Sequence, residues 1–118
     1  MKVLVVDDEE DVRFVAEVSL GRVGGMTVVV ASGGVEGLQL ARSEHPDFIL
    51  LDMMMPGMDG LTTFHALKAD PQTADIPVIF LTAKGLAPDT EHLGAKAVIL
   101  KPFDPMTLAS DIRKILES

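Results

Sequence analysis

The sequence contains five short runs of consecutive apolar residues, separated by longer stretches of mixed polarity. The runs cover residues 3–6, 28–31, 48–51, 78–81 and 97–100. None of them alternates between apolar and polar residues, and continuous apolar runs of this length are typical of strands that are covered on both faces. The pattern therefore predicts five strands of a parallel sheet.

The stretches between these runs carry apolar or small residues at helical spacing, which predicts helices that cover the sheet. The positions expected to face the sheet are Val12, Val15, Ala16, Ser19 and Leu20, then Val35, Leu38 and Ala41, then Leu61, Phe64 and Leu67. Gly24 and Gly25 are expected to end the first helix in a left-handed turn. A fourth helix, around residues 88–93, is expected to be short.

The last helix has the clearest sequence boundaries. Asp104 is expected to cap it, and Pro105 to lie in its first turn, where the missing N–H group costs nothing. Its buried stripe is expected to consist of Leu108, Ile112, Ile115 and Leu116.

A length of 118 residues suits one hydrophobic core but not two, so residues 1–118 are expected to form a single domain. Strands that alternate with helices are joined by right-handed crossovers. The expected fold class is α/β, a (βα)5 doubly wound five-stranded parallel sheet with the flavodoxin-like strand order 2-1-3-4-5.

Composition narrows the class of function. The formal net charge is −8, which opposes direct binding to nucleic acid or to anionic membranes. The chain has no cysteine, and its first apolar run is too short for a signal peptide or a membrane span. We expect a cytoplasmic protein without direct nucleic-acid or membrane partners.

Polar residues with chemical potential lie at the ends of the predicted strands. They are Asp7 and Asp8 after the first, Asp52 after the third, Thr82 at the fourth and Lys101 after the fifth. The carboxyl ends of parallel strands meet at one edge of the sheet, where such folds bind ligands. Crowded carboxylates repel one another unless a cation or a raised pKa relieves them. The sequence therefore predicts a site for a hard divalent cation.

Mg²⁺ suits this donor set, because it prefers oxygen ligands and retains several waters. Asp8 and Asp52 suit direct ligation, and Asp7 suits a water-mediated contact. An aspartate can also act as a nucleophile toward phosphorus, with metal and lysine neutralising phosphoryl charge. Lys101 can supply the neutralising positive charge, and Thr82 can supply a hydroxyl donor.

Four motifs occur in order along nearly the whole chain: Asp7-Asp8-Glu9, Asp52-Met-Met-Met-Pro56-Gly57, Thr82-Ala83-Lys84 and Lys101-Pro102-Phe103. In this combination the sequence resembles the response-regulator receiver family. The resemblance implies that Asp52 accepts a phosphoryl group from a histidine kinase or a histidine phosphotransfer protein. It also implies that Asp7, Asp8 and the backbone carbonyl of Met54 help hold Mg²⁺.

The resemblance further implies a cis Lys101-Pro102 bond and a Thr82 that moves toward the phosphoryl group. That movement would change a docking surface on the fourth helix, fifth strand and fifth helix, read by a downstream protein target or output domain. The protein would be a monomer or a phosphorylation-dependent dimer, and a phosphoacceptor rather than an enzyme with turnover.

The sequence departs from the family pattern in several places. Val98 stands where many members carry a Tyr or Phe that rotates with the threonine. The stretch from Thr82 to Lys101 is also a few residues short. Met54 and Lys84 occupy positions that tune phosphoryl hydrolysis in the family, and a methionine cannot orient an attacking water by hydrogen bonding. We expect slow self-dephosphorylation.

Several other interpretations remain open at the level of sequence. Asp7 and Asp8 can cap a helix, and Thr82 can be a strand residue. The methionines at 53, 54, 55 and 58 are expected to fill gaps beside the core, and His45, His65 and His92 to be surface or packing residues.

The rival functions are a flavodoxin-like electron carrier, a small phosphohydrolase and a non-phosphorylated docking module. The acidic residues after the first strand disfavour a flavin phosphate, and Met54 stands where a phosphohydrolase carries a second Asp. The chain can also be the receiver piece of a longer DNA-binding or catalytic regulator.

Overall fold

The computed structural model describes residues 1–83 and 94–118. Five parallel strands form one sheet in the order β2-β1-β3-β4-β5, as predicted. The strands are β1 (Lys2–Val6), β2 (Thr27–Ala31), β3 (Phe48–Asp52), β4 (Val78–Ala83) and β5 (Ala97–Lys101). Each predicted apolar run lies inside a strand that extends it by at most two residues.

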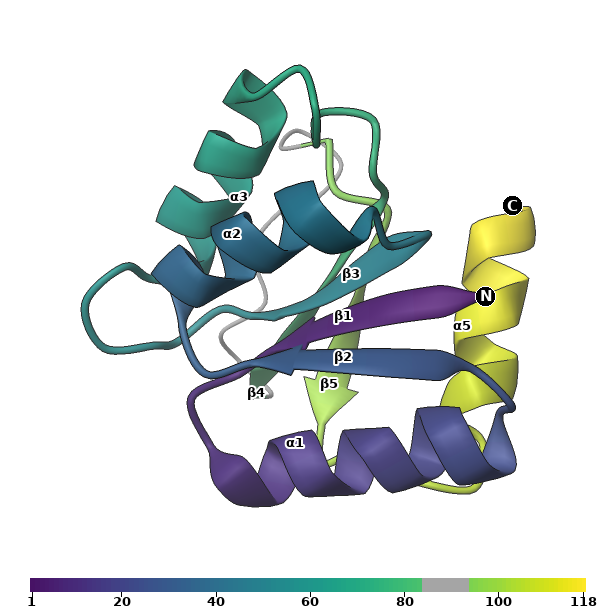
Figure 1. The fold of residues 1–118 in the computed structure, drawn as a ribbon. Helices are drawn as coiled ribbons and strands as arrows, with labels where there is room; N and C mark the ends of the chain where they lie inside the picture. Colours follow the sequence, from purple (N-terminus) through teal and green to yellow (C-terminus); the bar gives the residue numbers. More distant parts are fainter. Residues whose placement is uncertain (84–93) are drawn as a thin grey trace.

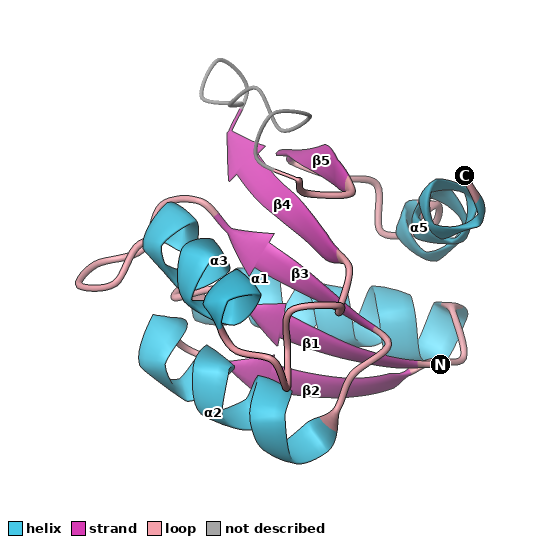
Figure 2. Ribbon diagram, turned by 90° about the horizontal axis from the view of Figure 1, so that it is seen from above, coloured by secondary structure: helices cyan, strands magenta, loops and turns pink. Residues whose placement is uncertain are grey.

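The described helices are α1 (Glu10–Glu17), α2 (Gly34–Glu44), α3 (Gly60–Ala69) and α5 (Leu108–Glu117). The chain continues from α1 directly into a π-helical segment, η1 (Val18–Val23). α1 and α5 cover one face of the sheet, and α2 and α3 cover the other (Figure 1, Figure 2). The fourth predicted helix lies outside the described residues.

The strands bury residues on both faces, which explains their continuous apolar sequence. Val3 and Val5 of β1 belong to the cluster beneath α1 and α5, whereas Leu4 and Val6 belong to the cluster beneath α2 and α3. The alternation of side chains along a strand divides the runs between two cores. No helix among the described residues is long and apolar enough to cross a membrane.

The prediction of which α2 residues face the sheet was partly wrong. Val35 was expected to face the sheet but is 60% exposed. The buried positions of α2 are Gly34, Gly37 and Ala41, with Leu38 partly buried. A Cβ at Gly37 would lie 3.0 Å from a methyl group of Val6, so the helix approaches β1 through this glycine. This close approach fixes the buried face of α2.

The prediction for the start of the last helix was also wrong. α5 begins at Leu108 with Thr107 as its N-cap residue, and no side chain caps it. Asp104 instead accepts a hydrogen bond from the Met106 N–H group at 2.9 Å, in a turn that also contains Pro105. The predicted stripe is largely confirmed, with two residues buried and two partly buried: Leu108, Ile112, Ile115 and Leu116.

The first helix ends as predicted, with a left-handed glycine. Gly25 has a φ of +72°, whereas Gly24 is still in the right-handed helical region. The chain therefore turns into β2 at the second of the two glycines.

Candidate functional site

The strand order brings the predicted site residues to one edge of the sheet. Asp7 follows β1, Asp52 ends β3, and Lys101 ends β5. Thr82 is the penultimate residue of β4 and pairs in register with Leu100 of β5. Asp8 follows Asp7 and is exposed. All five residues thus lie at the carboxyl edge, where the sequence places them.

Lys101 is the cationic centre of this group. Its Nζ lies 2.9 Å from Oδ2 of Asp7, 3.3 Å from Oδ1 of Asp52 and 3.7 Å from Oε1 of Glu9. Burial of the ammonium group opposes its charge, but the hydrogen bonds and negative charges of Asp7 and Asp52 raise the pKa of Lys101 above its usual range. Lys101 therefore stays protonated and balances part of the carboxylate charge.

Asp7 is fully buried, and each of its polar atoms has a partner. Its N–H donates to Ala31 at 3.1 Å, and its Oδ1 accepts from the Glu9 N–H at 2.9 Å. Its Oδ2 accepts from Lys101, and its backbone carbonyl accepts from Nη1 of Arg13 at 2.8 Å. Asp7 is therefore held rigidly, with its carboxylate already engaged by donors.

Asp52 is 2% exposed and less completely paired. Its Oδ1 accepts from the Met54 N–H at 3.2 Å and from Lys101, but its Oδ2 has no hydrogen-bond partner among the described residues. Burial, followed by the charge of Asp7, raises the pKa of Asp52 to about 6, against the opposing effects of Met54 and Lys101. One buried oxygen of Asp52 thus remains available.

Thr82 is the second buried residue with an incomplete hydrogen-bond network. It is 1% exposed, and its hydroxyl oxygen has no partner among the described residues. Within the described part of the chain, Thr82 Oγ1 and Asp52 Oδ2 are the two buried side-chain oxygens or nitrogens in this condition. Because unpaired buried polar atoms are costly, their presence at the same sheet edge fits a site that binds a ligand.

Three carboxylates at this edge can bind one cation. Asp7, Asp8 and Asp52 each offer an oxygen, and these oxygens lie within 4.8 Å of one another. The unpaired Asp52 oxygen and the raised pKa of that carboxyl show that the cluster lacks full charge compensation. Oxygen donors of this kind fit a hard divalent cation such as Mg²⁺.

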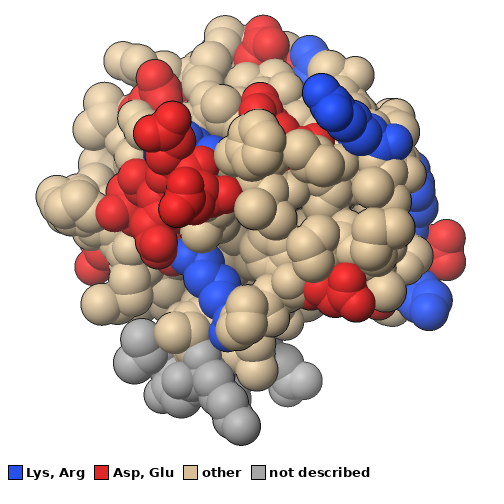
Figure 3. All heavy atoms as spheres, turned by 90° about the horizontal axis from the view of Figure 1, so that it is seen from below, with Lys and Arg blue, Asp and Glu red and all other residues tan. Residues whose placement is uncertain are grey.

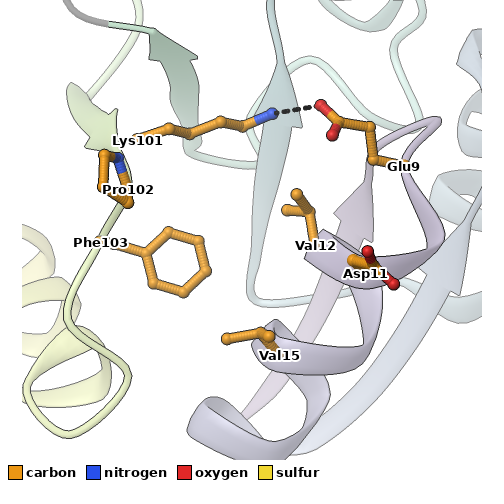
Figure 4. Close-up of a pocket in the computed structure, with 7 residues that line it drawn as sticks. All are labelled: Glu9, Asp11, Val12, Val15, Lys101, Pro102 and Phe103. Carbon is orange, nitrogen blue, oxygen red and sulfur yellow. Dashed lines mark ion pairs between the residues drawn. The ribbon is translucent and has the colours of Figure 1, made fainter.

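A pocket of about 380 Å³ adjoins the site between α1 and the segment after β5. Figure 4 shows Phe103 facing Val12 and Val15 across this pocket, with the Lys101–Glu9 ion pair at its rim. The Lys101-Pro102 peptide bond is cis, as expected. Residues 8–11 are all exposed and acidic, and one face of the molecule shows a dense group of acidic side chains (Figure 3).

The family profile described as "Response regulator receiver domain" matches residues 3–113, and so nearly the whole chain. The chain belongs to this family.

Curated relatives of this receiver domain include the probable transcriptional regulator ycf27 of Guillardia theta, 42% identical over 118 residues. The match covers 98% of this chain and 45% of the relative. The alkaline phosphatase synthesis transcriptional regulatory protein PhoP of Bacillus subtilis is 38% identical, and the match covers 98% of this chain and 48% of that relative. The chain thus spans about half the length of these curated relatives.

Solved structures support the same fold. The chemotaxis protein CheY4 of Vibrio cholerae has a TM-score of 0.86 at 30% identity, with 97% of each chain covered. The N-terminal domain of a response regulator receiver protein from Methanoculleus marisnigri has a TM-score of 0.81 at 39% identity, covering 99% of this chain and 97% of the other. The flavodoxin-like carrier and phosphohydrolase alternatives are therefore set aside.

The residues outside the carboxylate cluster are placed mostly as expected. Val98 is partly buried and packs on the cluster beneath α2 and α3, so β5 presents no rotating aromatic ring at this position.

The methionines after β3 differ in exposure. Met53 and Met55 are buried, but Met54 is 65% exposed. The expectation that all the methionines fill gaps beside the core was therefore wrong for Met54. His45 and His65 are exposed, whereas His92 and Lys84 lie outside the described residues.

One contact of the site was missed by sequence reasoning. Arg13 reaches back from α1 to the carbonyl of Asp7. The acceptor is a backbone atom, so no complementary side chain marks the pair. The available signal was an arginine two residues after the acidic stretch that follows the first strand.

Proposed function

We propose that Asp52 accepts a phosphoryl group and that this receiver domain switches a docking surface in response. The observation that carries the proposal is a pair of buried oxygens, Asp52 Oδ2 and Thr82 Oγ1, that have no hydrogen-bond partner in residues 1–83 and 94–118. Asp52 is also paired with the protonated Lys101. The first oxygen is an available nucleophile, and the second is an available hydrogen-bond donor. A phosphoryl group on Asp52 supplies oxygens that accept from Thr82 and Lys101.

The reaction transfers phosphorus between two groups. Asp52 Oδ2 forms a bond to phosphorus while the bond from phosphorus to a nitrogen of the donor's phosphohistidine breaks, and the bonding electrons leave with the imidazole. Lys101 lies next to both Asp52 and Asp7, so it offsets the added negative charge. The side chains of this domain position the nucleophile and balance charge, and no catalytic cycle with turnover is required.

Receiver domains generally use Mg²⁺ at an acidic pocket, and the three-carboxylate cluster here suits it. Asp8 and Asp52 would bind the ion directly, together with the backbone carbonyl of Met54. Asp7 would contact it through water, because its carboxylate is already engaged by Lys101 and the Glu9 N–H. Bound Mg²⁺ supplies additional positive charge toward the phosphoryl oxygens.

The partners follow from this chemistry. A histidine kinase or a histidine phosphotransfer protein supplies the phosphoryl group in the cytoplasm, and Thr82 moves toward it and alters the surface near β5. Curated relatives named as transcriptional regulators are about twice as long as this chain. We infer that residues 1–118 form a single domain that acts through a DNA-binding output of a longer regulator, as a monomer or a phosphorylation-dependent dimer.

The test is incubation with Mg²⁺ and acetyl phosphate, followed by intact mass measurement. We expect the mass of one added phosphoryl group on the wild type. The addition should be lost with Asp52→Asn and with EDTA but retained with Asp75→Asn, which removes an exposed carboxylate away from the site. No addition to a wild type that binds Mg²⁺ would contradict the proposal and favour a non-phosphorylated docking module.

A further inference from the structure

Arg13 lies in α1, and its side chain reaches back over the turn that follows β1. Its Nη1 donates to the backbone carbonyl of Asp7 at 2.8 Å. The side chain is partly buried, and its backbone N–H continues the helix by donating to the Glu9 carbonyl at 3.1 Å. Arg13 thus joins the start of α1 to the end of β1 through one charge-assisted hydrogen bond.

The accepting carbonyl belongs to the peptide group that connects Asp7 to Asp8. A peptide group is planar, so the direction of its carbonyl also fixes the direction in which the Asp8 backbone leaves the turn. Asp8 is exposed, and no described residue donates to its carboxylate. The orientation of Asp8 toward Asp7 and Asp52 therefore depends mainly on the backbone of this turn.

We propose that Arg13 is a positioning residue of the divalent-cation site. By holding the Asp7–Asp8 peptide, its guanidinium keeps the Asp8 carboxylate within reach of the carboxylates of Asp7 and Asp52. The inference rests on the proposed metal site of this receiver domain. It assigns to Arg13 no contact with the metal or with the phosphoryl group.

Two effects of Arg13 on cation binding have opposite signs, which makes the proposal testable. Its positive charge near three carboxylates repels a divalent cation, so removing the charge alone would tighten Mg²⁺ binding. Its hydrogen bond orders the turn, so removing the bond would weaken Mg²⁺ binding. Loss of residues that orient metal ligands commonly weakens metal affinity about 10-fold or more. We therefore expect the positioning effect to dominate.

The experiment titrates Mg²⁺ alone into wild type, Arg13→Met, Arg13→Lys and Arg22→Met. The chain contains no Trp or Tyr, so ¹H–¹⁵N NMR shifts are the direct readout. Met removes both charge and donor, while Lys retains a cationic donor. Arg22→Met is the matched control, because it removes the same charge from an exposed position at the far end of η1. Circular dichroism checks that each variant is folded.

We expect a Mg²⁺ dissociation constant raised about 10-fold by Arg13→Met, largely restored by Arg13→Lys and nearly unchanged by Arg22→Met. Faster amide exchange at Asp8 in metal-free Arg13→Met would support the same role. Binding by folded Arg13→Met that is as tight as wild type, or tighter, would overturn the inference while leaving the proposed function intact. Absence of Mg²⁺ binding to the wild type would overturn both.

Discussion

Lys101 Nζ lies 3.3 Å from Oδ1 of Asp52, yet the Asp52 carboxyl keeps a pKa of about 6. The lysine lowers this pKa, but burial and the neighbouring charge of Asp7 outweigh it. The positive charge of Lys101 therefore compensates the negative charge of the Asp52 carboxylate only in part, although the two groups are in contact. This imbalance has consequences for both stability and chemistry.

The first prediction concerns stability against pH. The pKa of Asp52 rises from the ordinary aspartate value of 3.8 to about 6 in the folded protein, so between these values the folded protein binds more protons than the unfolded chain. Stability from this residue is thus present below pH 4 and lost as pH rises to 6. Asp52→Asn should be more stable than wild type at pH 7, by up to about 3 kcal/mol, and equally stable near pH 4.

Urea denaturation of both proteins from pH 4 to pH 8, without divalent cations, checks this difference. Addition of Mg²⁺ should stabilise the wild type and narrow the gap, because the ion binds the folded carboxylates. A gap that stays constant across the whole pH range would contradict the raised pKa.

The second prediction concerns Thr82. Thr82→Val replaces a buried hydroxyl, which has no hydrogen-bond partner in the described part of the chain, with a methyl group of similar shape. The free energy of unfolding should stay constant or rise by about 1 kcal/mol, because no hydrogen bond to a described residue is lost and a desolvated polar atom is removed. The same variant should lose the NMR shifts of β4 that beryllofluoride, a phosphoryl mimic, induces in the wild type. Thr82→Ser, which retains the hydroxyl, is the control. Marked destabilisation by Thr82→Val would contradict the prediction, because it would show that the hydroxyl has a hydrogen-bond partner.

The third prediction concerns Gly60, the first residue of α3. A Cβ at this position would lie 2.6 Å from Cα of Met53 and would also clash with the backbone carbonyl of Asp52. Gly60→Ala should cost about 3 kcal/mol and weaken Mg²⁺ binding, because the strand end that bears Asp52 must move. Gly57→Ala, at a φ of +75° with open space around it, should cost only about 1 kcal/mol. Thermal denaturation distinguishes the two, and equal costs would be inconsistent with the packing described.

The fourth prediction concerns the lifetime of the aspartyl phosphate. The Met54 side chain is 65% exposed and offers no strong donor or acceptor to an attacking water. We expect slow self-dephosphorylation, over minutes or longer, with Met54→Asn hydrolysing several-fold faster and Met54→Leu behaving like wild type. Mass measurements after removal of the phosphodonor follow the decay. A wild-type lifetime of seconds in buffer with Mg²⁺ would contradict the expectation.

The sheet and the position of the site were predictable because both follow from short-range patterns. An apolar run predicts a buried strand, and parallel strands align their carboxyl ends. The polar residue at the end of each run is therefore placed without knowledge of side-chain contacts. Asp7, Asp52 and Lys101 meet for this reason.

The features that were missed depend on packing between distant segments. Val35 is exposed because α2 approaches β1 through Gly37, which hydropathy alone does not predict. Asp104 precedes α5 by a full turn, because its side chain bonds to the Met106 N–H before the helix begins at Leu108. The contact of Arg13 depends on the shape of a turn that is set only once β1 and α1 have packed.

Asp52 and Thr82 each bury an oxygen without a hydrogen-bond partner among the residues that the structure describes, and this also bears on how such a protein changes under selection. The free energy of unfolding of the resting state is lowered by these two buried oxygens, and substitutions at either position can raise it. The residues best suited to signalling are therefore not those that give the highest thermal stability. A library selected only for survival at high temperature would therefore enrich replacements at positions 52 and 82 early. Responsiveness would be lost in that population before the fold was.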